Sequence, residues 1–134
     1  MYCLDASVII SAARATEPYS ERSKAFLDRI REERIKIFLP EIILLEVASA
    51  LVRNTENHEF ALAFARSLRD FENFSLVSLD SKLTDSALTV IAETGLRGPD
   101  AVYVALAYEY KLALITLDRE QLSRSRNLIA VQQP

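Results

Sequence analysis

The chain has 134 residues, a net charge of −3, 50% hydrophobic residues and 26% charged residues. This length suits one domain, spanning residues 1–134, whose core is large enough to fold without disulfides, and the single cysteine excludes an internal disulfide. No apolar run reaches the roughly 18 residues that a membrane-spanning helix needs, so we expect a cytoplasmic protein that does not enter a membrane.

Short β-type runs alternate with longer helical ones along the chain. Strands are predicted at 2–4, 35–39, 74–79, 112–117 and 128–131. Helices are predicted at 19–34, from Pro40 past Glu46, at 56–71, from Asp80 or Ser81 to 94, from Pro99 to 110 and at 119–123. The alternation predicts an α/β fold with a central parallel sheet of about five short strands flanked by helices.

Two acids follow predicted strands at the end where parallel sheets bind ligands. Asp5 comes directly after the first strand, and Asp118 follows the strand LALIT, with Thr116 on the same strand face. Each aspartate also has a simpler explanation, because an aspartate after a strand commonly caps the next helix or closes a turn. Both interpretations remain open on the sequence alone.

Two further acids lie in apolar sequence. Asp100 falls in the first turn of the helix that begins at Pro99, where a carboxylate also complements the helix N-terminus. Glu46 lies within LPEIILLEVASALVR, and its position predicts a carboxylate in the middle of a helix. An unpaired carboxylate is costly to bury there, so either an ion pair with a buried Arg or Lys or a functional role must offset the cost.

A divalent cation explains the four acids together. Carboxylates brought close to one another repel, and a dry pocket cannot keep them ionised without a counter-charge. Mg²⁺ binds one or two carboxylates and leaves room for phosphate oxygens. Two such ions can activate a water and stabilise the leaving oxygen of a phosphodiester. The sequence therefore indicates a Mg²⁺ (or Mn²⁺) site.

Four motifs, LDASVIISA, LPEIILLEVASAL, GPDAVYVALA and LITLD, together resemble the PIN-domain family, most closely its VapC-type toxin-like members. The resemblance covers essentially the whole chain. It implies a PIN-like fold and a metal-dependent ribonuclease that is the toxin of a toxin–antitoxin pair. The catalytic and metal-binding residues that it implies are Asp5, Glu46, Asp100 and Asp118, supported by the hydroxyls of Ser7 and Thr116.

The chain departs from the family pattern at two places. Many members have an aromatic residue soon after the last acid, where this chain has Glu120, Gln121 and Leu122. Many also have an asparagine beside the first acid, where this chain has Ala6 and Ser7. These departures concern the positioning of the substrate more than the chemistry.

The negative net charge does not exclude RNA as the substrate. Setting the four acids aside changes the net charge from −3 to +1, and a bound cation would offset the acids themselves. Arg97, shortly before Asp100, and Arg14, after the first motif, are the predicted contacts to the RNA backbone. The resemblance further implies a homodimer and a small antitoxin protein as partners.

Other function classes fit less well. A phosphatase with an aspartate nucleophile after the first strand would have a second aspartate where this chain has Ser7, and a phospho-accepting receiver domain would have a lysine at a strand end. The alternative that remains is a non-catalytic RNA- or protein-binding module on the same fold.

Overall fold

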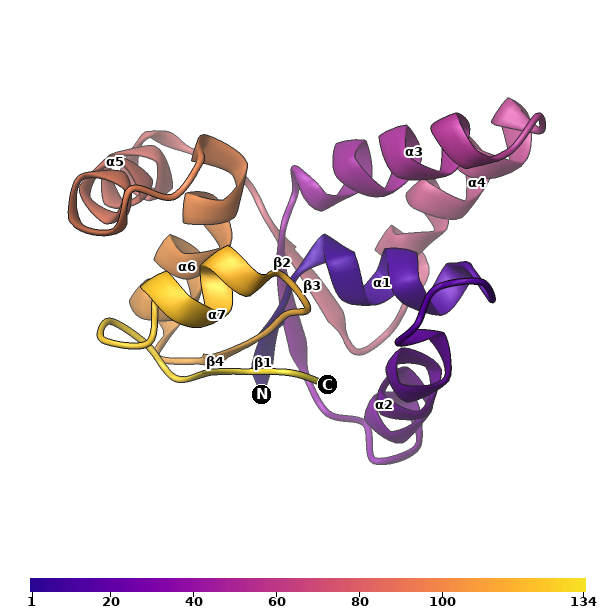
Figure 1. Cartoon of the computed structure of the whole chain (residues 1–134), viewed down its shortest axis with the longest axis horizontal. Coiled ribbons are helices and arrows are strands. Elements are labelled where there is room, and N and C mark those ends of the chain that lie inside the picture. Colours follow the sequence, from indigo (N-terminus) through magenta and orange to yellow (C-terminus); the bar gives the residue numbers. More distant parts are fainter.

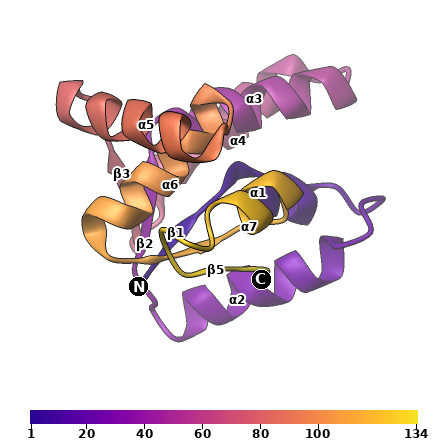
Figure 2. The same ribbon diagram turned by 60° about the vertical axis from the view of Figure 1, so that its left-hand side comes forward.

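A computed structural model describes residues 1–134 and shows a parallel sheet flanked by helices (Figures 1 and 2). The strands are β1 (Tyr2–Leu4), β2 (Ile37–Pro40), β3 (Phe74–Val77), β4 (Ala113–Ile115) and β5 (Val131–Gln132), in the spatial order β3-β2-β1-β4-β5. The central strand β1 pairs with β2 on one side and with β4 on the other. The predicted α/β fold with a parallel sheet of five short strands is confirmed.

Seven α-helices connect the strands. They are α1 (Ala6–Ala13), α2 (Ser20–Glu32), α3 (Ile43–Asn54), α4 (His58–Ser67), α5 (Ser81–Thr94), α6 (Gly98–Tyr110) and α7 (Arg119–Arg124), and a 3₁₀ turn, η1 (Leu68–Asp70), follows α4. In Figure 1, α1 to α4 lie on one side of the sheet and α5 to α7 on the other. This division follows from right-handed crossovers, because the chain reverses direction across the sheet after β3. No helix is both long and apolar enough to cross a bilayer.

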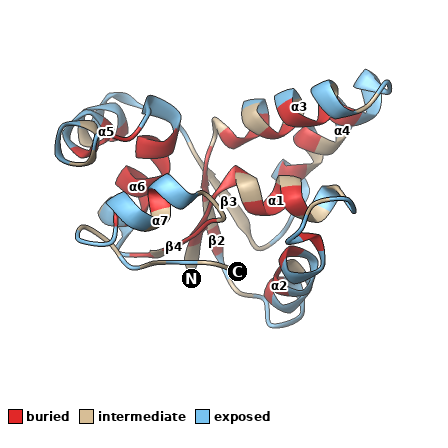
Figure 3. Cartoon of the chain, in the orientation of Figure 1, coloured by how far each residue is buried: buried red, intermediate tan, exposed pale blue.

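Helix α6 lies at the centre of the core. Every residue from Asp100 to Ala107 is buried, and Figure 3 shows the buried colour along much of this helix. The helix packs against β1 and β2 on one side and against α5 on the other. Its first turn is thereby fixed relative to the end of β1.

Helix α1 was not predicted from the sequence. The run SVIISA is rich in β-branched residues, which favour strands, and it contains no charged residue to indicate an amphipathic helix. The helix forms because Asp5 is its N-cap: the Asp5 carboxylate accepts a hydrogen bond from the Ser7 N–H at 3.0 Å. The chain therefore turns directly from the central strand into a helix.

The prediction that Pro40 begins the helix containing Glu46 was wrong. Pro40 is the last residue of β2 and pairs with Val77 of β3, and the Glu41 N–H continues that ladder to the Val77 carbonyl at 2.8 Å. A proline is tolerated there because the ladder between β2 and β1 ends at Phe38, so the missing N–H has no partner to lose. Helix α3 begins at Ile43, which places Glu46 in its first turn and not in the middle of the helix.

Helix α5 ends at Thr94, as predicted, and the next residue, Gly95, lies in the left-handed region with a φ of 68°. We expect Gly95→Ala to destabilise the protein by about 1–2 kcal/mol, because an L-residue is strained at positive φ. A Cβ at this position would also lie 3.1 Å from Nη1 of Arg124. Urea unfolding measures the effect.

The matched control is Gly98→Ala, since a Cβ at Gly98 meets nothing within 4 Å and the residue is helical. That variant should be as stable as the parent protein or slightly more stable. Equal losses of stability in the two variants would contradict the assignment of Gly95 as a conformational requirement.

Candidate active site

All four acids singled out in the sequence line one cavity of about 430 Å³, at the edge of the sheet where β1 and β4 end. Asp5 follows β1, Asp118 follows β4, and Glu46 and Asp100 lie in the first turns of α3 and α6. The other residues that line the cavity come from α1 and α3: Ala6, Ser7, Ile10, Leu45, Ser49, Ala50 and Arg53.

Each acid lies at the beginning of a helix. Asp5 is the N-cap of α1 and Asp118 is the N-cap of α7, while Asp100 and Glu46 are the third and fourth residues of their helices. The capping explanation considered for Asp5 and Asp118 therefore holds, and it does not exclude a place in the cavity. Helix N-termini carry partial positive charge, so four of them favour anionic groups at this edge.

Asp5 is buried and carries three hydrogen bonds. Its Oδ2 accepts from the Ser7 N–H at 3.0 Å and from the Thr116 hydroxyl at 3.2 Å, and its Oδ1 accepts from the Gln121 amide at 3.1 Å. Burial raises the pKa of the Asp5 carboxyl, and the hydrogen bonds from Ser7, Gln121 and Thr116 offset part of that rise. No basic side chain pairs with it.

The hydroxyls of Ser7 and Thr116 connect the ends of β1 and β4. Thr116 Oγ1 donates to Asp5 and accepts from the Asp118 N–H at 2.9 Å. Ser7 Oγ accepts from the Leu117 N–H at 3.0 Å and lies 3.4 Å from Thr116 Oγ1. The two hydroxyls thus link Asp5 to the backbone around Asp118 through hydrogen bonds.

Glu46 is half-buried, and its partner is a tyrosine. The fully buried Tyr103 donates its hydroxyl hydrogen to Glu46 Oε2 at 2.5 Å. Burial raises the pKa of Glu46, the Tyr103 hydrogen bond lowers it, and the charges of Asp5 and Asp100 raise it further. No Arg or Lys forms an ion pair with Glu46, so the structural alternative considered for this residue is not what the structure shows.

Of the two arginines predicted to contact RNA, only Arg97 lies beside the acids. Its Nε donates to Asp100 Oδ2 at 3.1 Å, and its side chain is 83% exposed. The ion pair therefore contributes little to the stability of the fold, and Arg97 can leave Asp100 for another anionic partner. Arg14 lies at the end of α1, pairs with Glu17 at 2.5 Å, and is not among the residues that line the cavity.

Sequence reasoning missed three residues at the site. Arg53 lines the cavity because it follows Glu46 and Ala50 on the same face of α3, a spacing visible in the sequence. Tyr103 reaches Glu46 from one turn after Asp100. Gln121 reaches Asp5 from the third position of α7. The only sequence signal for this position is that it lies three residues after Asp118, the aspartate that caps α7.

The cavity fits a divalent cation in donor type and in charge. Its acids offer oxygen ligands, which Mg²⁺ and Mn²⁺ prefer, and three of the four have no ion pair to neutralise them. The side chains do not form a closed set of ligands: nowhere in the chain do three or more His, Cys, Asp or Glu side chains converge closely enough to hold a metal ion. The site is therefore a negatively charged cavity and not a preformed coordination cage.

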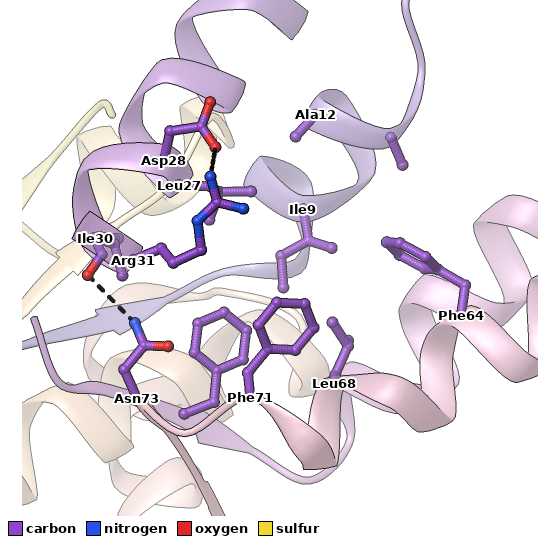
Figure 4. A pocket seen from close by; sticks show the side chains of 12 residues that line it. Ile9, Ala12, Leu27, Asp28, Ile30, Arg31, Phe64, Leu68, Phe71 and Asn73 are labelled. Atoms are coloured by element: carbon purple, nitrogen blue, oxygen red, sulfur yellow. Dashed lines mark hydrogen bonds and ion pairs between the residues drawn. The ribbon is translucent and has the colours of Figure 1, made fainter. Parts of the chain in front are cut away.

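A different cavity, of about 240 Å³, lies between α1, α2 and the segment from α4 to β3 and is mostly apolar (Figure 4). Its polar side chains are already paired, since Arg31 Nη2 donates to Asp28 at 3.1 Å and Asn73 Nδ2 donates to the Ile30 carbonyl at 3.5 Å. It contains none of the four acids. The four acids therefore meet in the acidic cavity and not in this apolar one.

Comparison with known families gives one match, to the PIN domain, over residues 2–127. No curated protein matches the chain significantly in sequence. The structure is similar to many solved structures, and the likeness confirms the predicted PIN-like fold.

The VapC20 toxin of Mycobacterium tuberculosis, described as cleaving the sarcin-ricin loop, has a TM-score of 0.79 and 14% identity, covering 100% of both chains. FitAcB from Neisseria gonorrhoeae has a TM-score of 0.75 and 21% identity, covering 100% of this chain and 98% of the other. A toxin–antitoxin complex from Klebsiella pneumoniae has a TM-score of 0.70 and 16% identity, covering 92% of this chain and 91% of the other. At such identities the likeness shows the fold alone.

The raised pKa values of Asp5 and Glu46 predict how stability depends on pH in the metal-free protein. Because these groups hold protons more tightly when folded, the folded state binds more protons than the unfolded state above their ordinary pKa values of 3.8 and 4.5. The free energy of unfolding should therefore fall as pH rises from about 4 through the raised pKa values. Urea unfolding at several pH values measures this dependence.

The informative comparison is with the variants Glu46→Gln and Asp5→Asn. In each variant, the free energy of unfolding should fall less steeply with rising pH than in the parent protein. Glu109 contributes the opposite slope, because hydrogen bonds from Ser86 and Lys82 lower its pKa, and it does so equally in all three proteins. The same pH dependence in parent and variants would contradict the assignment.

Proposed function

The chain belongs to the PIN domain family, and from this premise we propose that it is a metal-dependent endoribonuclease, the toxin of a toxin–antitoxin pair. The observation that supports the proposal best is the gathering of Asp5, Glu46, Asp100 and Asp118 around one cavity. The VapC20 toxin, which has the same fold, is described as cleaving an RNA loop. The proposed reaction is hydrolysis of an RNA phosphodiester bond.

Asp5, Asp100 and Asp118 would hold Mg²⁺ or Mn²⁺, with Glu46 on the wall of the cavity formed by α3. PIN-domain nucleases generally use divalent metal ions. Such an ion supplies a Lewis acid toward the phosphate and lowers the pKa of a water molecule.

The chain's own residues would then take separate roles. Asp5 is fixed by three hydrogen bonds, which suits a group that must keep one orientation. Glu46 has a raised pKa, lines the cavity and is only half-buried, which suits a carboxylate that takes a proton from the attacking water. Tyr103 holds Glu46 in place through its hydroxyl.

RNA backbone phosphates would be bound by Arg53 and Arg97, together with the helix N-termini around the cavity. Arg53 lines the cavity and forms no ion pair, so its guanidinium is available to a phosphate. Arg14 stays a proposed contact only for RNA that extends beyond the end of α1.

We also propose an antitoxin protein and a second copy of the chain as partners, in the cytoplasm. The similar Klebsiella structure is a toxin–antitoxin complex. Exposed leucines at 45, 62 and 79 surround a further cavity of about 530 Å³ between α3 and α4, and Leu45 lines both this cavity and the acidic one. A protein bound over these leucines would reach the acidic cavity.

Incubation of a mixed RNA pool with the protein tests the enzymatic proposal. We expect cleavage with Mn²⁺ or Mg²⁺ and none with EDTA. Asp5→Asn should lose at least about 100-fold in rate, because loss of a ligand exceeds the roughly 10–100-fold effect of removing an outer partner. The control Asp28→Asn removes an exposed acid outside the acidic cavity and should cleave normally.

Two results would count against this proposal. Cleavage that persists in EDTA would exclude the metal-dependent mechanism. RNA binding without cleavage under any metal condition would favour the alternative, a non-catalytic RNA- or protein-binding module on the same fold.

The role of Arg53 is tested by RNA binding in the Asp5→Asn background, where the RNA stays intact. If Arg53 contacts one backbone phosphate, Arg53→Gln should reduce the dependence of log affinity on log salt concentration by about 0.7. With an RNA too short to extend beyond the end of α1, Arg14→Gln should leave this slope unchanged, because Arg14 is paired with Glu17 and lies outside the cavity lining. The reverse pattern would show that Arg14 is the phosphate contact.

A further inference from the structure

Gln121 connects three of the four acid-bearing positions. It is the third residue of α7, its side chain is completely buried, and it lies outside the lining of the cavity. Its amide Nε2 donates to Asp5 Oδ1 at 3.1 Å and lies 3.4 Å from the Asp100 carbonyl oxygen. Its backbone N–H donates to Asp118 Oδ1 at 2.8 Å.

The burial of this amide is not explained by core packing. Its Oε1 is buried and has no hydrogen-bond partner. Burial of a carbonyl without a partner is costly, so an apolar side chain of similar volume would serve the core better at this position. What the amide provides, and an apolar side chain cannot, is the N–H that reaches Asp5.

That N–H controls the less restrained of the two Asp5 oxygens. Oδ2 of Asp5 has two donors, Ser7 and Thr116, whereas Oδ1 has only Gln121. The terminal torsion of an aspartate is broad, so a carboxylate held at one oxygen can still rotate. With Gln121 in place, both oxygens are held and the plane of the carboxylate is set.

We propose that Gln121 is a positioning residue that sets the orientation of the Asp5 carboxylate toward the acidic cavity, so that the acids can hold a divalent cation. The inference rests on the proposed function. Residues that orient metal-binding side chains typically change metal affinity or activity 10–100-fold when they are replaced.

The test compares Gln121→Met and Gln121→Leu with Ser125→Ala. The first two variants keep an apolar side chain of similar size and remove the amide. The control, Ser125→Ala, removes a buried hydroxyl just after the same helix. That hydroxyl donates to the main-chain carbonyl of Gln121 and has no contact with Asp5. Calorimetric titration with Mn²⁺, steady-state cleavage of RNA and thermal melting are measured for each protein.

We expect the Gln121 variants to bind Mn²⁺ about 10–100-fold more weakly and to lose kcat by a similar factor, with KM for RNA unchanged. Their melting temperatures should stay within about 5 °C of the parent, because removal of the unpaired side-chain carbonyl offsets loss of the hydrogen bond to Asp5. Ser125→Ala should retain the Mn²⁺ affinity and kcat of the parent.

Parent-like Mn²⁺ affinity and kcat in a folded Gln121 variant would overturn the inference and leave the proposed function intact. Equal losses in Ser125→Ala, or failure of both Gln121 variants to fold, would assign Gln121 a structural role instead. A parent protein that neither binds Mn²⁺ nor cleaves RNA would overturn the proposed function, and this inference with it.

Discussion

The candidate site depends on the gathering of negative charge at one edge of a parallel sheet. Because all five strands run in the same direction, the helices that follow β1 and β4 begin at the same edge, and α3 and α6 begin there too. Each of these four helices brings one carboxylate, and the helix N-terminus stabilises it. Only Asp100 has a basic partner, and that partner is exposed, so the cavity keeps a surplus of negative charge.

This arrangement sets stability against function. Burial raises the pKa of Asp5, which means that its ionised form weakens the folded state. The neutral groups around it, Thr116 and Gln121, recover part of that loss through hydrogen bonds without cancelling the charge. A cation that enters the cavity would offset the remaining cost of burying ionised Asp5. Its binding would therefore be coupled to the stability of the fold.

The sequence predicted the order of the elements and the four acids because both leave local signals. Alternating short and long apolar runs indicate a parallel α/β fold, and acids after strands or at helix starts are visible one by one. The helix after Asp5 was missed since its β-branched residues favour a strand, and Pro40 was misplaced because its strand position depends on where pairing with β1 ends. Tyr103 and Gln121 left no signal, because their role depends on α6 and α7 packing against distant parts of the chain.

The strand order also bears on synthesis of the protein. The strand before Asp5 pairs with β4, and the acid that follows β4 lies 113 residues further along the chain. A growing polypeptide therefore lacks the complete set of acids until Asp118 has been added and its strand has paired with β1. Shorter products carry at most three of the four carboxylates, so the acidic cavity cannot be complete in them.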